Sequence, residues 1–326
     1  MASTKKAHET TKRVPSKKLL STVILVTVVL STLLIVYYVL LQPHGDEWAA
    51  ALVDQLAVEE SLYRPEFNNA CTQLLAASGY SARYYPGKDV TIDFYEELPS
   101  KGRKIVLVRA HSAVREGSAY VDLFTSEIYD ERKASDEYAY LALNRHISKA
   151  SFNVPPYTNY FAVGPSFVSS VMKGGFSDCF IVLMGCNSLN QTSMAEALVV
   201  KGARVIVGWT GNVTVSDTDT SVLHLLDLLL KEDYTVHRAV EMVNEHDVLG
   251  DTKLDYYPKD DKTRSYRVPT RSDAASLPLL NQPMLLFSLP PQLRTPQLNR
   301  TARAIDRADT TSRFDLCPQV LWIAVS

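Results

Sequence analysis

The chain has 326 residues, of which 46% are hydrophobic and 21% are charged, and its formal net charge at pH 7 is −2. These values exclude a disordered or collagen-like chain and a small disulfide-rich scaffold. The charge is unevenly distributed, because residues 1–18 hold six Lys and Arg against one Glu, which leaves 28 basic and 35 acidic residues in the remainder. An acidic body argues against nucleic acid as a partner.

An uncharged stretch of 23 residues follows the basic leader, at residues 19–41. As a helix it would extend about 34 Å, enough to cross a hydrocarbon core of about 30 Å. The alternative is a cleaved secretory signal, but its apolar region would run only about 7–15 residues and end at a small-residue cleavage site, which is missing here. The basic leader and the acidic Asp46 and Glu47 place the N-terminus in the cytoplasm. The sequence therefore predicts a cytoplasmic tail, one transmembrane helix and an extracytoplasmic main domain.

Short apolar runs alternate with helical segments beyond the span, which is typical of a parallel sheet covered by helices on both faces. Strands are expected at residues 50–53, 82–85, 105–110, 160–163, 180–184, 205–209 and 284–289. Helices are expected at residues 66–77, 91–98, 194–201, 219–231 and 236–244. We therefore predict an α/β domain with a mostly parallel central sheet over residues 42–290 and a C-terminal extension over residues 291–326.

Two polar segments lie outside this pattern. Residues 113–159 contain a candidate hairpin at residues 120–124 and then a charged stretch, and they are expected to form a wall or lid beside the site. Residues 250–276 are rich in Asp, Lys, Tyr and Pro and are expected to be a loop.

A histidine and a cysteine follow two of the apolar runs, at the strand ends where open α/β sheets bind their ligands. His111 and Ser112 come after residues 105–110, and Cys186 comes shortly after residues 180–184. A nearby imidazole converts a thiol into the nucleophilic thiolate and later donates a proton to the leaving amine. Backbone N–H groups at Ser112 and Cys186 would then stabilise the developing oxyanion. Such spacing by itself is common among α/β proteins.

The two segments, KIVLVRAHSA at residues 104–113 and CFIVLMGCNS at residues 179–188, resemble the caspase-like cysteine peptidase superfamily. This group includes caspases, legumain, clostripain, gingipains, separase and the CHAT domains. In these proteins a hydrophobic strand ending in His and a small residue precedes, by about 75 residues, a second strand ending in a small residue and Cys. The resemblance covers roughly residues 48–245, including the helix that runs to KGA, the strand that runs to GW and the acidic loop that opens a long helix.

The resemblance implies a three-layer α/β/α sandwich and a cysteine peptidase. Cys186 would be the nucleophile, His111 the general base and acid, and the backbone N–H groups of Ser112 and Cys186 the oxyanion hole. The chain departs from the family at two positions: Ser112 stands where Gly is usual, and Gly185 stands where Ala is more usual.

Other residues have two interpretations each. The family resemblance implies that Asp217 or Asp219 shapes a pocket for a basic residue before the scissile bond, but Ser216 and Asp219 also have the spacing of a helix capping box. Trp209 either lines the site or belongs to the core. Asp54 either orients His111 or caps a loop.

No cofactor or metal is implied, because the cysteines form no C-x-x-C pair. Cys71 and Cys179 are expected to be buried small hydrophobic residues. Local hydrogen bonding or solvation is expected for the four histidines without a partner at regular spacing, which are His146, His224, His237 and His246.

The sequence thus predicts a membrane-anchored cysteine endopeptidase that acts on peptide or protein substrates. Peptide ligation at the same pair of residues and a non-catalytic receptor or interaction module remain as alternatives.

Overall fold

The computed structural model describes residues 25–32, 48–152, 157–247, 250–271 and 320–323. The chain divides into two compact units, Met1–His44 and Gly45–Ser326. In the first unit, residues 25–32 form a helix with exposed side chains. No helix within the described ranges is both long and apolar enough to cross a membrane. Most of residues 19–41 fall outside those ranges, so the transmembrane helix stays a prediction.

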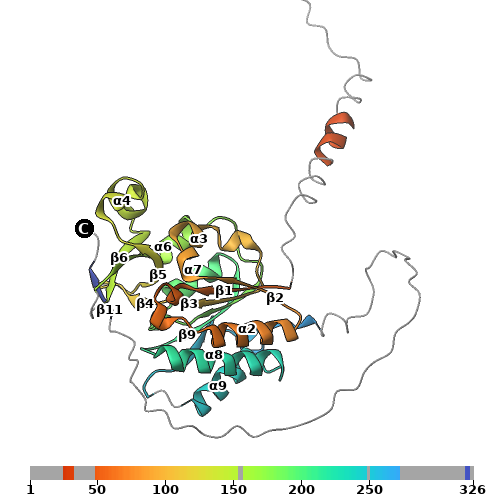
Figure 1. Ribbon diagram of the computed structural model, residues 1–326. Helices are drawn as coiled ribbons and strands as arrows, with labels where there is room; N and C mark the ends of the chain where they lie inside the picture. Colours follow the sequence, from red (N-terminus) through yellow and green to blue (C-terminus); the bar gives the residue numbers. More distant parts are fainter. Residues whose placement is uncertain (1–24, 33–47, 153–156, 248–249, 272–319, 324–326) are drawn as a thin grey trace, which may run out of the picture. The chain divides into compact units, whose positions relative to one another are not determined.

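Sheet A is the centre of the second unit and has six strands in the order β10-β9-β8-β3-β1-β2 (Figure 1). Its strands are β1 (Ala49–Asp54), β2 (Ser81–Tyr85), β3 (Ile105–Arg109), β8 (Cys179–Leu183), β9 (Ala203–Trp209) and β10 (Leu254–Tyr257). The first five are parallel, and β10 pairs antiparallel with β9 at the edge. Every residue of β1, β3 and β8 is buried, as their continuous apolar sequences predict. The predicted α/β class with a mostly parallel sheet is confirmed.

Helices cover both faces of sheet A (Figure 1). Side chains from α2 (Pro65–Ala77), α8 (Val215–Leu230) and α9 (Val236–His246) form one hydrophobic core with one face of the sheet. Side chains from α3 (Ile92–Glu97), α6 (Pro165–Ser170) and α7 (Ser193–Val200) form the other core with the opposite face. The shorter helices are α4 (Glu131–Ser135), α5 (Ala139–Leu143) and α10 (Asp261–Arg264).

Sheet B is a second, antiparallel sheet with the order β11-β6-β7-β5-β4. Its strands are β4 (Ser112–Val114), β5 (Val121–Ile128), β6 (Ile147–Phe152), β7 (Asn159–Val163) and β11 (Val320–Ile323). The segment predicted as a wall or lid holds strands of sheet B together with α4 and α5. Its hairpin is formed by β4 and β5, so residues 121–124, expected to form the hairpin, are part of one strand, β5. The predicted strand at residues 160–163 exists, but it belongs to sheet B and not to the central sheet.

Several predicted boundaries need correction. The helix expected at residues 219–231 begins at Val215, because the Thr214 hydroxyl accepts the Asp217 N–H and caps it; Ser216 is not the cap. The helix expected at residues 194–201 follows Thr192, and the Ser193 hydroxyl instead donates to Ala119 O. Residues 250–276 hold β10 and α10 in their described part, and the strand expected at residues 284–289 lies outside the described residues.

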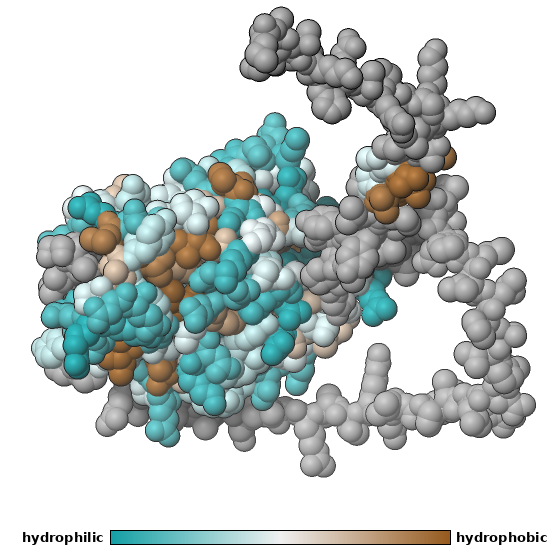
Figure 2. All heavy atoms as spheres, turned by 90° about the horizontal axis from the view of Figure 1, so that it is seen from above, coloured by the Kyte–Doolittle hydropathy of each residue, from teal (hydrophilic) through white to brown (hydrophobic). Residues whose placement is uncertain are grey.

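The surface seen from above in Figure 2 is largely hydrophilic, with small separate hydrophobic patches. Among the large exposed hydrophobic side chains are Leu143 on α5 and Val200 on α7, which are 85% and 82% exposed. Isolated exposed apolar side chains are normal on folded domains.

Candidate functional site

The candidate site lies at the carboxyl edge of sheet A, where β3 and β8 end side by side. The two strands are parallel neighbours, and their last paired residues are Val108 and Leu183. His111 and Cys186 each stand three positions beyond this pair. Because parallel strands end at the same edge, the segments that carry the histidine and the cysteine lie side by side at this edge of the sheet.

The loops that carry these residues are directly joined. The Ser112 hydroxyl donates a hydrogen bond of 2.7 Å to the carbonyl oxygen of Cys186. Gly185 permits this approach, since a Cβ atom there would lie 2.3 Å from Ser112 Oγ and 2.4 Å from Ala110 O. The two departures from the family pattern are therefore linked, because the hydroxyl of Ser112 occupies space beside Gly185 that a methyl group would need.

Replacing Gly185 by Ala is expected to lower the free energy of unfolding by about 1–3 kcal/mol, because the new methyl group overpacks a buried contact. Adding Ser112→Gly should recover only part of the loss, since the contact with the Ala110 carbonyl persists. Urea denaturation of the two single variants and the double variant measures the coupling free energy between positions 112 and 185. Gly175→Ala is the matched control, because its nearest atom would be 3.1 Å from the new Cβ. Equal costs for the two Gly→Ala variants would contradict the steric argument.

The backbone N–H of Ser112 points away from β5. Ser112 faces Leu123 across the β4–β5 ladder, and the ladder hydrogen bond next to this pair runs from Phe124 N to His111 O. Ser112 therefore occupies a non-hydrogen-bonded position, where the N–H of each residue points outward. A Cβ atom on Gly185 would be 2.9 Å from this nitrogen, so the nitrogen lies close to the loop that contains Cys186.

His111 is buried against sheet B, with its side chain only 4% exposed. Its ring packs on Phe124 at a centroid distance of 5.8 Å, and its Nε2 lies 3.9 Å from Oε1 of Glu59. Gln55 Oε1 accepts the His111 backbone N–H at 3.0 Å. Burial, together with the positive charge of Arg109, lowers the pKa of His111 to about 3. The imidazole is therefore neutral at pH 7, and in this buried state it is a weak base.

Cys186 is held by the loop that follows β9. Its thiol donates to Val213 O at 3.3 Å, and its Sγ accepts the Val213 N–H at 3.5 Å. The next residue, Asn187, adopts the left-handed conformation with φ 56°, and its N–H donates to Gly211 O at 2.8 Å. Cys186 thus stands in a sharp turn against residues 211–213.

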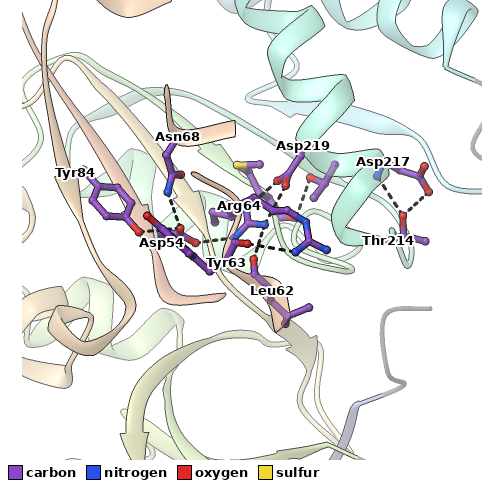
Figure 3. A network of polar contacts seen from close by, with 12 residues as sticks. Asp54, Leu62, Tyr63, Arg64, Asn68, Tyr84, Thr214, Asp217 and Asp219 are labelled. Carbon is purple, nitrogen blue, oxygen red and sulfur yellow. Dashed lines mark hydrogen bonds and ion pairs between the residues drawn. The ribbon is translucent and has the colours of Figure 1, made fainter. Parts of the chain in front are cut away.

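A buried ion network joins the ends of β1 and β3 to the first turns of α8 (Figure 3). Arg109 is fully buried and donates to both oxygens of Asp219 at 2.8 and 2.9 Å. It also donates to Asp54 Oδ1 at 2.7 Å and to Leu62 O at 3.0 Å. Burial alone would lower the pKa of Arg109, but the hydrogen bonds and charges of the two carboxylates outweigh it and hold the pKa above its usual value.

This network corrects two of the predicted roles. Asp219 has both oxygens bound by Arg109, so its carboxylate is not available to a basic substrate side chain. Asp54 is engaged by Arg109 through one oxygen and by Asn68 and Tyr84 through the other, at 3.2 and 3.1 Å (Figure 3). The carboxylate that faces the His111 ring nitrogen is that of Glu59, which no sequence pattern marked.

Asp217 lies in the first turn of α8 and Trp209 belongs to the core. The half-buried Asp217 carboxylate accepts the hydroxyl of the capping residue Thr214 at 2.7 Å. Trp209 is fully buried, and its Nε1–H donates to Thr218 Oγ1 at 2.8 Å. It is a core residue that lines no exposed surface.

The two other described cysteines are buried within the core. Cys71 on α2 and Cys179 at the start of β8 are each 0% exposed. Burial raises the pKa of both thiols, and the Asp219 carboxylate adds to the effect at Cys71. Neither thiol forms a thiolate at neutral pH, which leaves Cys186 as the candidate nucleophile among these three.

No model of a known protein family matches the chain, and no curated protein matches it. The functional interpretation therefore rests on the geometry of the site and on the sequence.

Proposed function

We propose that the chain is a membrane-anchored, caspase-like cysteine endopeptidase in which Cys186 attacks a peptide carbonyl and His111 transfers the proton. The observation that carries the proposal is the adjacency of β3 and β8, whose ends are joined by the hydrogen bond from Ser112 Oγ to Cys186 O. A cysteine and a histidine that are 75 positions apart in the sequence thus come directly after two neighbouring strand ends, at the same edge of the sheet.

The fold supports the finer assignment to a three-layer α/β/α sandwich of the caspase-like type. A mostly parallel sheet with helices on both faces is the arrangement that this class requires. Residues 19–41 are proposed as the membrane anchor, with the main domain outside the cytoplasm, on the strength of their length and flanking charges.

The proposed reaction begins when the surrounding loops open, because access of water returns the pKa of His111 toward its ordinary value and lets the imidazole take the Cys186 proton. The thiolate then attacks the scissile carbonyl, and the N–H groups of Ser112 and Cys186 stabilise the resulting oxyanion. The imidazolium gives its proton to the leaving amine, and water hydrolyses the acyl-enzyme. Glu59 is suited to stabilise the transient imidazolium, since its carboxylate lies 3.9 Å from Nε2. For substrates with a basic residue before the scissile bond, Asp217 remains the candidate pocket residue.

The test compares Cys186→Ala with Cys179→Ala in the full chain. Cys179 is the first residue of β8, and Cys186 follows the end of the same strand. On a mixed peptide library, Cys186→Ala and His111→Ala are each expected to lower kcat/KM by about 10³-fold or more, whereas Cys179→Ala should retain activity. Absence of cleavage by the intact chain, with thiol-reactive probes labelling Cys186 no faster than Cys71, would sink the proposal.

One observation favours a second candidate, a non-catalytic receptor or interaction module. Cys186 and His111 are only 6% and 4% exposed, so a substrate reaches them only after the surrounding loops open. In that case Cys186→Ala would leave the binding of a protein partner unchanged, and the intact chain would cleave nothing.

A further inference from the structure

A second cluster of metal-binding side chain types joins α8 to the end of α9. His224 lies on α8, His246 is the last residue of α9, and Asp247 follows it as the C-cap. One ligand atom from each of these three residues can be chosen so that all lie within 4.8 Å of one another. Residues separated by more than 20 positions in the sequence therefore converge on one point.

The distances are of the order that a small cation requires. His246 Nδ1 lies 2.8 Å from Asp247 Oδ1, and His224 Nδ1 lies 3.9 Å from Asp247 Oδ2. Zinc with bonds of about 2.0–2.1 Å in a tetrahedral site separates its ligand atoms by about 3.3 Å. The three candidate ligand atoms lie within 4.8 Å of one another, so side-chain rotations would have to bring them closer for one ion to contact all three.

Two further features support a ligand set over a chance cluster. Nδ1 of His224 is buried and has no hydrogen-bond partner in the part of the chain that the structure describes. The Ser221 hydroxyl, on a residue that is 1% exposed, donates to Asp247 Oδ2 at 2.6 Å. Hydrogen bonds of this kind from a buried neighbour orient ligating carboxylates in metal sites.

We propose that His224, His246 and Asp247 bind one zinc ion, with a fourth position open to water. Two imidazoles and one carboxylate are a ligand set that zinc favours, and three protein ligands leave an open position. The metal links α8, whose first turns carry Asp219, to the C-terminal end of α9. In the structure His246 is 76% exposed and bonded to the adjacent Asp247, as the sequence interpretation expects, and the proposed zinc ion adds a role to this histidine and to His224.

The alternative is a hydrogen-bonded helix end without metal, in which His246 and Ser221 simply hold Asp247. Calorimetric titration of the chelator-treated full chain with zinc chloride separates the two. We expect binding of about one zinc per chain, with a Kd that rises at least about 10-fold in His224→Gln and in His246→Gln, and about 10-fold in Ser221→Ala. His237→Gln, which alters another histidine on α9, is the matched control and should bind zinc as the unmodified chain does.

Spectroscopy distinguishes the loss of a metal ligand from the misfolding of a variant. Cobalt(II) added to the same protein should give the visible absorption of a tetrahedral site, and circular dichroism shows whether each variant is folded. The proposal is overturned by no binding at 100 µM zinc, by equal Kd values in the unmodified chain and a folded His224→Gln variant, or by cobalt spectra that match cobalt in buffer.

Discussion

Replacing Arg109 by Met is expected to lower the free energy of unfolding by about 3–5 kcal/mol, the cost of removing one partner from a buried ion network. The guanidinium is the shared partner of Asp54 and Asp219, both of which are buried. Met fills a similar volume, so little of the decrease in the free energy of unfolding comes from lost packing. Most of it comes from the two carboxylates, which stay buried but no longer have a cation beside them. Urea denaturation at pH 7 measures it.

Arg238→Met is the matched control for this experiment. Arg238 also faces two carboxylates, those of Glu241 and Glu245, but it is 46% exposed. Exposed ion pairs contribute about 0–1 kcal/mol, so this variant should be nearly as stable as the unmodified chain. If both substitutions cost the same, the network around Arg109 is not a buried determinant of stability.

The stability of the domain is expected to fall as the pH drops from about 6.5 toward 3, and part of this loss should depend on His111. Its pKa is lowered to about 3 by burial and by Arg109, whereas an unfolded chain has the ordinary value of about 6.5. Between these values the unfolded chain binds a proton that the folded chain does not, so the free energy of unfolding falls with decreasing pH. The slope from one such group approaches about 1.4 kcal/mol per pH unit.

The difference between the unmodified chain and His111→Gln isolates this contribution. Burial also lowers the pKa of His146, but that residue is present in both proteins and its effect cancels. The free energy of unfolding of both proteins is measured by denaturation at several pH values from 4.5 to 8.5. Plotted against pH, the two free energies should differ by a constant amount above about pH 7.5 and approach each other below pH 6. A constant difference across the range would show that His111 titrates normally in the folded protein.

The parallel strands of sheet A are predictable because the central ones, β3, β8 and β9, are nearly continuous apolar runs, and the predicted bounds of all five agree with the structure within two residues. β10 is not predictable in this way, since Leu254–Tyr257 is short, sits in a polar segment and is stabilised by pairing with β9. Most of sheet B escapes prediction for the same reason. Its strands pair across long separations, such as β6 with β11.

The placement of His111 and Cys186 after neighbouring strands can be predicted from the strand ends in the sequence. The ion partners of the charged residues nearby cannot be predicted in this way. Arg109 stands inside the run IVLVRA, and only the fold reveals that Asp219 lies beside it. Two capping boxes with identical spacing overlap at the start of α8, and the structure selects the one that contains Thr214. A lone charge in a buried strand is the signal that could have pointed to the network.

The pairing of Arg109 with Asp219 also has a consequence during synthesis. The two residues are 110 positions apart. A ribosome adding about 5–20 residues per second produces Asp219 roughly 5–20 s after Arg109. Throughout that interval β1 and β3 can meet, and Asp54 is present, but the guanidinium has only one of its two carboxylates. The nascent sheet therefore keeps a half-neutralised cation and an uncovered apolar face until α8 emerges.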